Sequence, residues 1–450
     1  MKKTMISLLQ SIIISFLFIS ALSCSKTFEW QWATKAGGDS NDFGKAITTD
    51  ENGNIYITGS FSDFATFGTY LLTSSGGEDI FIAKMDASGK WTKAIKAGGR
   101  NNDSGNAITI DEKGNTYITG SFTKEAYFGS KHLTANGDND IFVAKFNSLG
   151  YCLWAIKAGG KFSDVGRAIT IDGSGNTYIT GSFSNEATFG PHHITCRGRT
   201  AIFVAKMDSN GKWLWAKQSE GTGGYAISSD NNGNIAILGY FYDNANFGSI
   251  TLETYKPYDI FVAKMDAFGN WLWATKAGRE GNVEEIAITT DDTGNSYITG
   301  SFYGTATFGY NYLSCSGGCN IFVAKIDTDG NWLWAKQSEG MTPSNGTGIA
   351  VDDSGNSYIT GFFSGSTTIG INSFTNQFGN SIFVAKIDKA GNWLWATNAD
   401  GKNLGSTTEI ALDNANNGYI TGNFNNTINF DSHSLKSNSY YDIFVAKFND

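Results

Sequence analysis

The 450-residue sequence has little proline, histidine and charge: it contains 3 Pro and 4 His, and charged residues make up 17% of it. Aromatic residues make up 14%, too large a share of core-forming side chains for a disordered chain. The near absence of proline, with 55 Gly, excludes a collagen helix, which needs glycine at every third position. Strong helix formers are scarce and glycine weakens helices, so a helical protein is also disfavoured.

Several functional motifs are missing as well. The formal net charge is −9 and no cluster of basic residues stands against it, which argues against nucleic-acid binding. No histidine is placed beside a candidate nucleophile, and no glycine-rich phosphate loop opens a helix. The sequence therefore predicts a β protein that is not an enzyme.

The first 23 residues have the pattern of an export signal. Lys2 and Lys3 precede an apolar run that is too short for a comfortable membrane span. The run ends in Ser-Ala-Leu-Ser-Cys, which resembles the lipobox of bacterial lipoproteins, so we expect cleavage before Cys24 and lipidation of that residue. Residues 1–23 are then the signal peptide and 24–28 a short lipidated tether. An acylated cysteine carrying more than one chain gives stable anchoring, which predicts attachment to the bacterial cell envelope, at the outer membrane or cell surface.

Internal repetition dominates the sequence from residue 29 to residue 450. The string Ile-Phe-Val-Ala-Lys, or its Ile-Phe-Ile-Ala-Lys variant, recurs seven times at a spacing of 61 residues, once shortened to 58; it ends at Lys84, Lys145, Lys206, Lys264, Lys325, Lys386 and Lys447. A second string, Asp-x-x-Gly-Asn-x-Tyr-Ile-Thr-Gly, keeps the same rhythm with small departures; its aspartates are Asp50, Asp111, Asp172, Asp230, Asp291, Asp352 and Asp413.

Each unit is predicted to contain four strands, at 46–49, 55–61, 80–84 and near 91 in the first copy. Tight turns beginning at Asp50 and Asp86 join the first strand to the second and the third to the fourth, because glycine and asparagine there accept positive φ. These turns should lie on one face of the molecule, called here the turn face. The longer connections should lie on the opposite face, the link face, where ligands usually bind.

The strands are apolar on both faces and grow bulkier from the first to the fourth, which suits blades packed around an axis. We therefore predict a seven-bladed β-propeller with four strands per blade, in preference to an open solenoid. A lone strand near Trp30 precedes the first unit, and the last unit lacks its fourth strand. The N-terminal strand is expected to complete the last blade and so to close the ring.

At this level of detail the repeat resembles the bacterial SBBP-type β-propeller repeat, through its Gly-Asn-x-Tyr-Ile-Thr-Gly and Asp-Ile-Phe-Val-Ala-Lys strings. The resemblance implies a propeller in an exported or surface-associated protein, and many relatives of that kind have no assigned activity. The segment from Asp86 to Trp91 is also similar, more weakly, to the quinoprotein-type propeller repeat.

One departure from the repeat is a connection, from Lys217 to Asp230, that is three residues shorter than the others. The same unit carries Ala236 in place of the usual tyrosine. The shortened connection and Ala236 mark the best place to look for a notch in the ring, although a neutral deletion is the preferred explanation.

The link face also contains candidate chemical groups. A pair of its carboxylates would suit a glycosidase, but solvated loop carboxylates are the preferred interpretation. The candidates for a binding rim are Glu220, Glu280, Glu284 and Glu339, with Glu285 and Glu409 nearby in the sequence. Asp42, Asp103 and Asp164 recur in the first three links and offer oxygen ligands for calcium, but turn capping explains them equally well, and no cofactor is expected. Cys315 and Cys319 flank one loop and would close a short disulfide in an exported protein.

The sequence as a whole favours a lipid-anchored, monomeric binding or scaffold module for a protein or a glycan. The alternatives are an extracellular carbohydrate-active enzyme with a carboxylate pair on the link face, and a quinone-dependent enzyme with a ring of charged residues around its cofactor. The ligand cannot be named from the repeat, because the repeat describes how the ring is built.

Overall fold

The computed structural model describes residues 28–450 except 198–199, 221–222, 231, 243, 255–257, 279–282, 316, 402–403 and 439. The predicted signal peptide and Cys24 lie outside these residues. Within them, no helix is both long enough and apolar enough to cross a membrane.

The described residues form six antiparallel sheets of four strands each. Five of these sheets follow one another along the chain: β2 (Asp42–Thr49), β3 (Ile55–Phe61), β6 (Asp79–Met85) and β7 (Trp91–Ala97); β8 (Asp103–Ile110), β9 (Thr116–Phe122), β12 (Asp140–Phe146) and β13 (Cys152–Ala158); β14 (Val165–Ile171), β15 (Thr177–Phe183), β18 (Ala201–Met207) and β19 (Trp213–Glu220); β20 (Gly223–Ser229), β21 (Ile235–Phe241), β24 (Asp259–Met265) and β25 (Trp271–Ala277); β26 (Val283–Thr290), β27 (Ser296–Phe302), β30 (Asn320–Ile326) and β31 (Trp332–Gln337).

The sixth four-stranded sheet joins the two ends of the chain. It consists of β37 (Leu404–Leu412), β38 (Gly418–Phe424), β41 (Asp442–Asn449) and the N-terminal strand β1 (Glu29–Ala36). Strand β1 pairs with β41 from Glu29 opposite Asn449 to Ala36 opposite Ile443, as the missing fourth strand of the last unit led us to expect. Both ends of the chain are thereby hydrogen-bonded into one sheet, which leaves no open edge at this junction.

The prediction of seven four-stranded blades is wrong: the structure has six. The strands of the sixth repeat unit belong instead to a seven-stranded sheet, made of β32 (Glu339–Gly340), β33 (Ser344–Val351), β34 (Ser357–Ile369), β35 (Asn372–Ile387), β36 (Trp393–Gly401), β39 (Thr427–Phe430) and β40 (His433–Lys436). The cause is continued pairing: β34 and β35 stay in register past one irregularity at Ser364–Gly365, and Asp400 and Gly401 of β36 then pair with β39.

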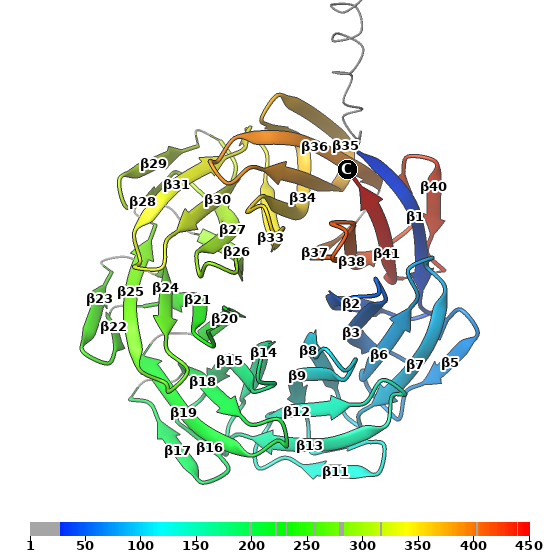
Figure 1. Cartoon of the computed structure of the whole chain (residues 1–450). Helices are drawn as coiled ribbons and strands as arrows, with labels where there is room; N and C mark the ends of the chain where they lie inside the picture. The colour runs from blue at the N-terminus through cyan, green and yellow to red at the C-terminus, as the bar shows by residue number, and fades with distance from the viewer. Residues whose placement is uncertain are drawn as a thin grey trace, which may run out of the picture.

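Five short hairpins, which the sequence analysis treated only as links, lie between second and third strands: β4 (Phe64–Phe67) with β5 (Tyr70–Thr73), β10 (Glu125–Phe128) with β11 (Lys131–Thr134), β16 (Glu186–Phe189) with β17 (His192–Thr195), β22 (Asn244–Phe247) with β23 (Ile250–Glu253), and β28 (Thr305–Phe308) with β29 (Asn311–Ser314). Figure 1 shows the hairpins at the periphery of a ring of sheets. The strands closest to the central opening are β2, β8, β14, β20, β26, β33 and β37.

Packing between neighbouring sheets follows the predicted gradient of side-chain size. The middle strands are buried along their whole length, as in β3 and β12, whereas the outer strand β7 alternates between buried and more exposed residues. The tryptophan that begins an outer strand packs on a hairpin phenylalanine in several sheets: the ring centroids of Phe67 and Trp91 are 5.2 Å apart, and Phe67 lies 4.9 Å from Phe81. These aromatic groups tie each hairpin to the sheet behind it, so the hairpins are part of the core.

Candidate functional site at the ends of the axial channel

The innermost strands line a central channel, and one position on them differs from repeat to repeat. It lies five residues before the turn aspartate and holds Lys45, Asn106, Arg167, Tyr225, Ile286, Thr347 and Thr408 in successive units. On the link side of the channel, four of these residues line a cavity of about 340 Å³ together with Phe43, Gly44, Glu409 and Asn423. This volume is that of a small-ligand pocket. We call it the link-end cavity.

A line of hydrogen bonds crosses three sheets beside this cavity. Lys45 Nζ donates to Ser104 Oγ at 2.6 Å, Ser104 Oγ to Asn106 Oδ1 at 2.8 Å, and Asn106 Nδ2 to the carbonyl oxygen of Gly166 at 2.9 Å. Burial lowers the pKa of Lys45, because the charged form loses its hydration. Its hydrogen-bond partner is a neutral hydroxyl, so the ammonium charge is held without being neutralised.

Arg167 lies over an aromatic ring on the next sheet. Its Cζ atom is 4.5 Å from the centroid of Tyr225, a cation–π contact. Tyr225 in turn meets Tyr240 edge to face at 4.9 Å, and Tyr240 meets Tyr258 at 5.5 Å. Tyr225 and Tyr240 belong to the unit with the shortened connection, and Tyr240 replaces a serine that four other units share.

Glu409 is the carboxyl group of the link-end cavity. It lies on β37 opposite Thr421, at a position where most other units have alanine. Loss of hydration on burial raises its pKa to about 8, and the N–H of Ile410 opposes this only in part. At neutral pH the side chain is therefore mainly an uncharged acid. From the sequence alone, Glu409 is predicted only to lie near the candidate rim glutamates.

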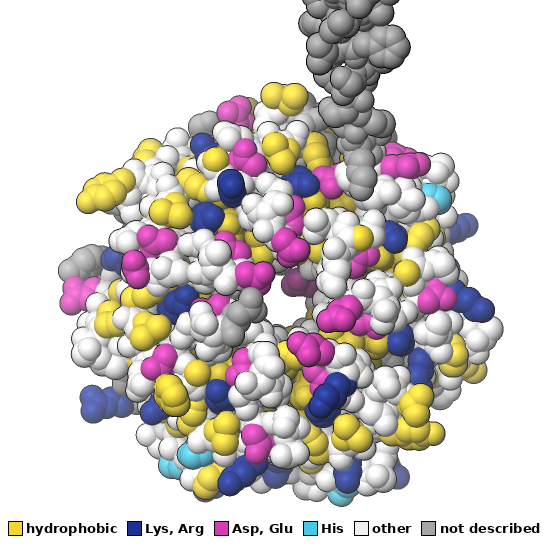
Figure 2. Space-filling model, viewed as in Figure 1, with side chains coloured by type: hydrophobic (Ala, Val, Ile, Leu, Met, Phe, Trp, Pro, Cys, Tyr) yellow, Lys and Arg dark blue, Asp and Glu magenta, His cyan; other side chains and the backbone are white. Residues whose placement is uncertain are grey.

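The turn side of the channel opens into a second cavity, of about 450 Å³, which we call the turn-end cavity. Its lining comes mainly from the turns of the first two units and includes Asp50, Glu51, Asp111 and Glu112. Figure 2 shows acidic side chains close to the central opening of the ring. Its charged lining includes the turn aspartates, which recur in every unit, whereas the charged residues of the link-end cavity do not recur.

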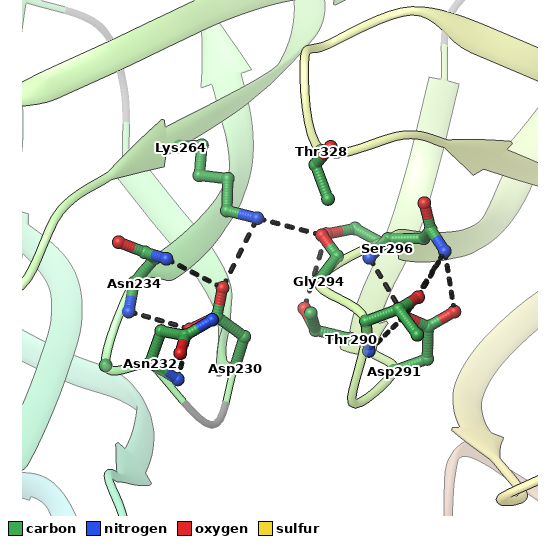
Figure 3. A network of polar contacts seen from close by, with 12 residues as sticks. Asp230, Asn232, Asn234, Lys264, Thr290, Asp291, Gly294, Ser296 and Thr328 are labelled. Atoms are coloured by element: carbon green, nitrogen blue, oxygen red, sulfur yellow. Dashed lines mark hydrogen bonds and ion pairs between the residues drawn. The ribbon is translucent and has the colours of Figure 1, made fainter.

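The turn aspartates have structural roles, as Figure 3 shows for Asp230. Its Oδ1 accepts hydrogen bonds from the backbone N–H of Asn232 at 3.0 Å and of Asn234 at 2.9 Å, and its Oδ2 accepts one from Asn234 Nδ2 at 2.9 Å. Lys264 Nζ lies 3.4 Å from Asp230 Oδ2 and donates to the carbonyl oxygen of Gly294 at 2.8 Å, which links one sheet to the next. The network closes the turn and holds neighbouring sheets together.

The same network explains the alanine that departs from the repeat. In six units the repeated lysine lies over the ring of the repeated tyrosine, as Lys206 does over Tyr178 at 4.6 Å. Where Ala236 replaces the tyrosine, both Ala236 and Lys264 are buried. Lys264 donates to Gly294 of the next sheet, as Lys206 does to Ala267, so the contact between sheets is kept and the buried Ala236 marks no notch in the ring.

Each calcium candidate is buried beside a second aspartate at a junction between sheets. A Cβ atom added to Gly98 would lie 2.3 Å from Asp79 Oδ1 and 2.9 Å from Asp103 Oδ2, so the two carboxyl groups are close neighbours. Asp42 faces Asp442 across Gly37, and Asp164 faces Asp140 across Gly159, in the same way. No group of three or more His, Cys, Asp and Glu among the described residues is arranged to hold a metal ion.

Burial is the main cause of the raised pKa values at these junctions: about 8 for Asp42, about 7 for Asp103 and about 6 for Asp164. Backbone N–H groups oppose it, as Gly99 does by donating to Asp103 Oδ2 at 2.6 Å. One lysine approaches each pair; Lys35 Nζ, for instance, lies 2.9 Å from Asp442 Oδ2. Burial also raises the pKa of the partners Asp79, Asp140 and Asp442, although the lysine opposes it, so each pair is most readily accommodated with a proton.

Of the four predicted rim glutamates, Glu339 is the one whose side chain lies in the described part of the structure. Glu339 is exposed on β32 and pairs with the outer end of β34, away from the channel. Glu220 and Glu284 lie on β19 and β26, but their side chains are outside the described part of the structure, as is all of Glu280. What the search for carboxylates missed was a position on the innermost strand whose residue type changes from unit to unit.

The predicted disulfide between Cys315 and Cys319 is not formed in this structure. The Sγ atom of Cys315 lies 3.2 Å from the carbonyl oxygen of Gly318, and that of Cys319 lies 3.2 Å from Asn345 Oδ1. The two sulfur atoms thus have separate polar neighbours. The predicted lipidation site, Cys24, lies outside the described residues.

Comparison with known proteins agrees with the fold. The sequence model of the SBBP β-propeller repeat matches residues 31–60, 95–121 and 334–361, which confirms the predicted resemblance in those segments. The structure has a β-propeller fold, and these three segments match that repeat. It is 26% identical over 533 residues to an uncharacterized WD repeat-containing protein, L264, of Acanthamoeba polyphaga mimivirus; the alignment covers 93% of this chain and 38% of that relative's length.

Solved structures with similar folds have very different sequences. A europium-containing methanol dehydrogenase is 9% identical, with a TM-score of 0.42 and 93% of each chain covered. The Dos1 propeller is 7% identical, with a TM-score of 0.47 over 94% of this chain and 95% of the other. A PL25 ulvan lyase is 12% identical, with a TM-score of 0.46 over 88% and 93%. Similarities of this size assign neither an activity nor a ligand.

Proposed function

We propose that this protein is a monomeric, lipid-anchored binding module of the bacterial cell envelope, at the outer membrane or cell surface, and that it holds a glycan or protein ligand in the link-end cavity. The observation that carries the proposal is the lining of that cavity. The turn aspartate is the same in all seven units, yet the described lining of the cavity includes Lys45, Asn106, Arg167 and Tyr225, which occupy one repeat position and differ from unit to unit. A ring that served only as a scaffold would have no need for this variation at one end of its channel.

The ligand site is tested by binding measurements on the purified protein. Immobilised glycans and envelope proteins are screened first, and any ligand found is titrated in solution. Tyr225→Ala, which removes an aromatic wall of the cavity, is expected to weaken binding at least tenfold. Tyr312→Ala, at an exposed tyrosine on the hairpin β28–β29, is the matched control. Equal binding by both variants would place the ligand elsewhere.

The anchor is tested separately by growth with labelled palmitate. The wild-type protein is expected to take up the label and Cys24→Ala to lose it, because no other residue of the leader fits the lipobox pattern. Cys196→Ala is the control that keeps the label. A labelled Cys24→Ala protein would contradict the assignment of the anchor.

An extracellular carbohydrate-active enzyme remains the second candidate because of Glu409. A carboxyl group whose pKa is raised to about 8 would suit a general acid. The described lining of the cavity contains no second carboxyl group, however, and glycosidases of the common types use two. Release of reducing ends from a bound polysaccharide, lost in Glu409→Gln with binding retained, would favour the enzyme.

A further inference from the structure

The link-end cavity has a charge opposite to that of the whole protein. The chain carries a formal net charge of −9, yet the cavity is lined by Lys45 and Arg167. Neither cation is within ion-pair distance of a carboxylate in the part of the chain that the structure describes. A longer-range attraction from Glu78 acts on Lys45, but it does not outweigh the effect of burial. Two half-buried cations thus remain available to an anion.

The carboxyl group in the same cavity does little to cancel this charge. Burial favours the uncharged form of Glu409 at neutral pH. The described lining therefore carries more positive than negative charge within an acidic protein, and low-dielectric walls strengthen such a local field. An anionic group is the ligand feature that this field selects.

The remaining walls are aromatic and amide side chains. Phe43 and Tyr225 are the aromatic residues of the described lining; the ring of Tyr225 carries the Arg167 guanidinium and packs edge to face on Tyr240. Asn106 and Asn423 add amide groups to the lining; Asn423 replaces the serine found in four other units. Aromatic faces with nearby amides suit a pyranose ring, which has apolar C–H faces and hydroxyl edges.

From this combination we infer that the ligand is an acidic saccharide, a chain bearing uronate groups, with a carboxylate held between Lys45 and Arg167 and a sugar ring packed beside Tyr225. The inference rests on the proposed function and narrows its ligand to one chemical class. An extended polyanion such as a nucleic acid needs a track of many cations, whereas this cavity offers two and the rest of the molecule is acidic.

The test is calorimetric titration of the purified protein with three probes: tetragalacturonate, the uncharged galactotetraose, and tetraglutamate as an acidic peptide. We expect tetragalacturonate to bind, with affinity that falls as salt rises, and the other two to bind at least tenfold more weakly. Lys45→Met and Arg167→Met should each weaken tetragalacturonate binding at least tenfold. Lys113→Met removes an exposed lysine of the turn-end cavity and should leave it unchanged.

Each other outcome overturns a defined part of the argument. Equal binding of galactotetraose, lost in Tyr225→Ala, would overturn the acidic ligand and keep the proposed function. Tetraglutamate binding in place of the saccharide would overturn the saccharide. If tetragalacturonate binds Lys45→Met and Arg167→Met as tightly as wild type, or if no probe binds, the inference falls; the glycan and envelope-protein screen with Tyr225→Ala then decides the proposed function independently.

Discussion

The two ends of the axial channel are built by different rules. The lining of the turn-end cavity includes aspartate and asparagine residues that recur from unit to unit and bond to one another, as Asn54 Nδ2 does by donating to Asp50 Oδ2 at 2.7 Å. The link-end cavity is lined by residues that differ between units and whose charges lack ionic partners among the described residues. A repeated, mutually bonded residue maintains the ring, whereas an unrepeated charge without an ion-pair partner is free to serve a ligand. The comparison predicts that the turn end controls stability and the link end controls binding.

The largest effect is expected at the turn end, for Asp172→Ala. Asp172 accepts hydrogen bonds from Asn176 and from Tyr178 Oη, and it lies 3.6 Å from the buried Lys206. Its removal leaves a buried ammonium without its carboxylate, which should lower the free energy of unfolding by about 3–5 kcal/mol. Denaturant unfolding measures the loss. Glu112→Ala, at an exposed residue of the neighbouring turn, is the control and should cost less than about 0.5 kcal/mol.

A somewhat smaller effect is expected for Gly98→Ala, at the junction between the first two sheets. Gly98 has a φ of +135°, and an added Cβ would meet Asp79 Oδ1 at 2.3 Å. Backbone strain and this clash together should lower the free energy of unfolding by about 2–3 kcal/mol. Gly173→Ala is the matched control, because a Cβ there meets no atom within 4 Å. Equal stability of the two variants would show that the junction relaxes without cost.

The paired aspartates should make stability fall as the pH rises. The folded-state pKa values of Asp42, Asp103 and Asp164, about 8, 7 and 6, exceed the unfolded value of about 3.9. Groups raised in this way contribute stability that is complete below pH 4 and is lost as the pH passes through 6 to 8. The midpoint of thermal unfolding should therefore fall by a few degrees between pH 5 and pH 9.

The charged groups beside Asp42, Asp103 and Asp164 determine which replacements serve as the control for this pH dependence. Asp442 and Asp63 raise the pKa of Asp42, Asp79 raises that of Asp103, and Asp140 raises that of Asp164; Lys35, Lys96 and Lys157 pair with the partner carboxylates. Combined replacement of Asp42, Asp103 and Asp164 by asparagine should flatten the dependence above pH 5. Asp172 acts in the opposite direction: burial opposes its ionisation, but hydrogen bonds from Asn176 and Tyr178 and the nearby Lys206 together lower its pKa, so its contribution is lost in acid below about pH 4.

The smallest effect on stability is expected at the link end. Lys45 and Arg167 make no ion pair with a described carboxylate, so Lys45→Met and Arg167→Met should each change the free energy of unfolding by less than about 0.5 kcal/mol while weakening ligand binding. Lys206→Met is the contrasting variant, because Lys206 is buried against Asp172. If Lys45→Met lowers the free energy of unfolding as much as Lys206→Met does, the two ends of the channel do not differ in their contribution to stability.

Much of the ring could be predicted from the repeat, and specific parts could not. The turn aspartates, the positive-φ glycines and the strand strings recur in the repeat. The four strands of the unit can therefore be located in each of the seven copies. The merging of β34 and β35 with their outer hairpin was missed, because it depends on whether strand pairing continues past Ser364 and Gly365. The sequence interpretation placed the candidate site residues among glutamates of the links. The two cations of the link-end cavity, Lys45 and Arg167, lie instead on the innermost strands.

The sequence by itself determined the unit, its four strands and the need to join the two chain ends, because hydrogen-bonded turns and apolar strands are local properties that a repeat displays again and again. The tertiary structure decided the number of four-stranded blades and the membership of the cavity. Lys45 and Arg167 are separated by two repeat lengths along the chain, and only the curvature of the ring brings them to one cavity. The repeated residues build the ring, and residues that differ between units come together in the candidate site.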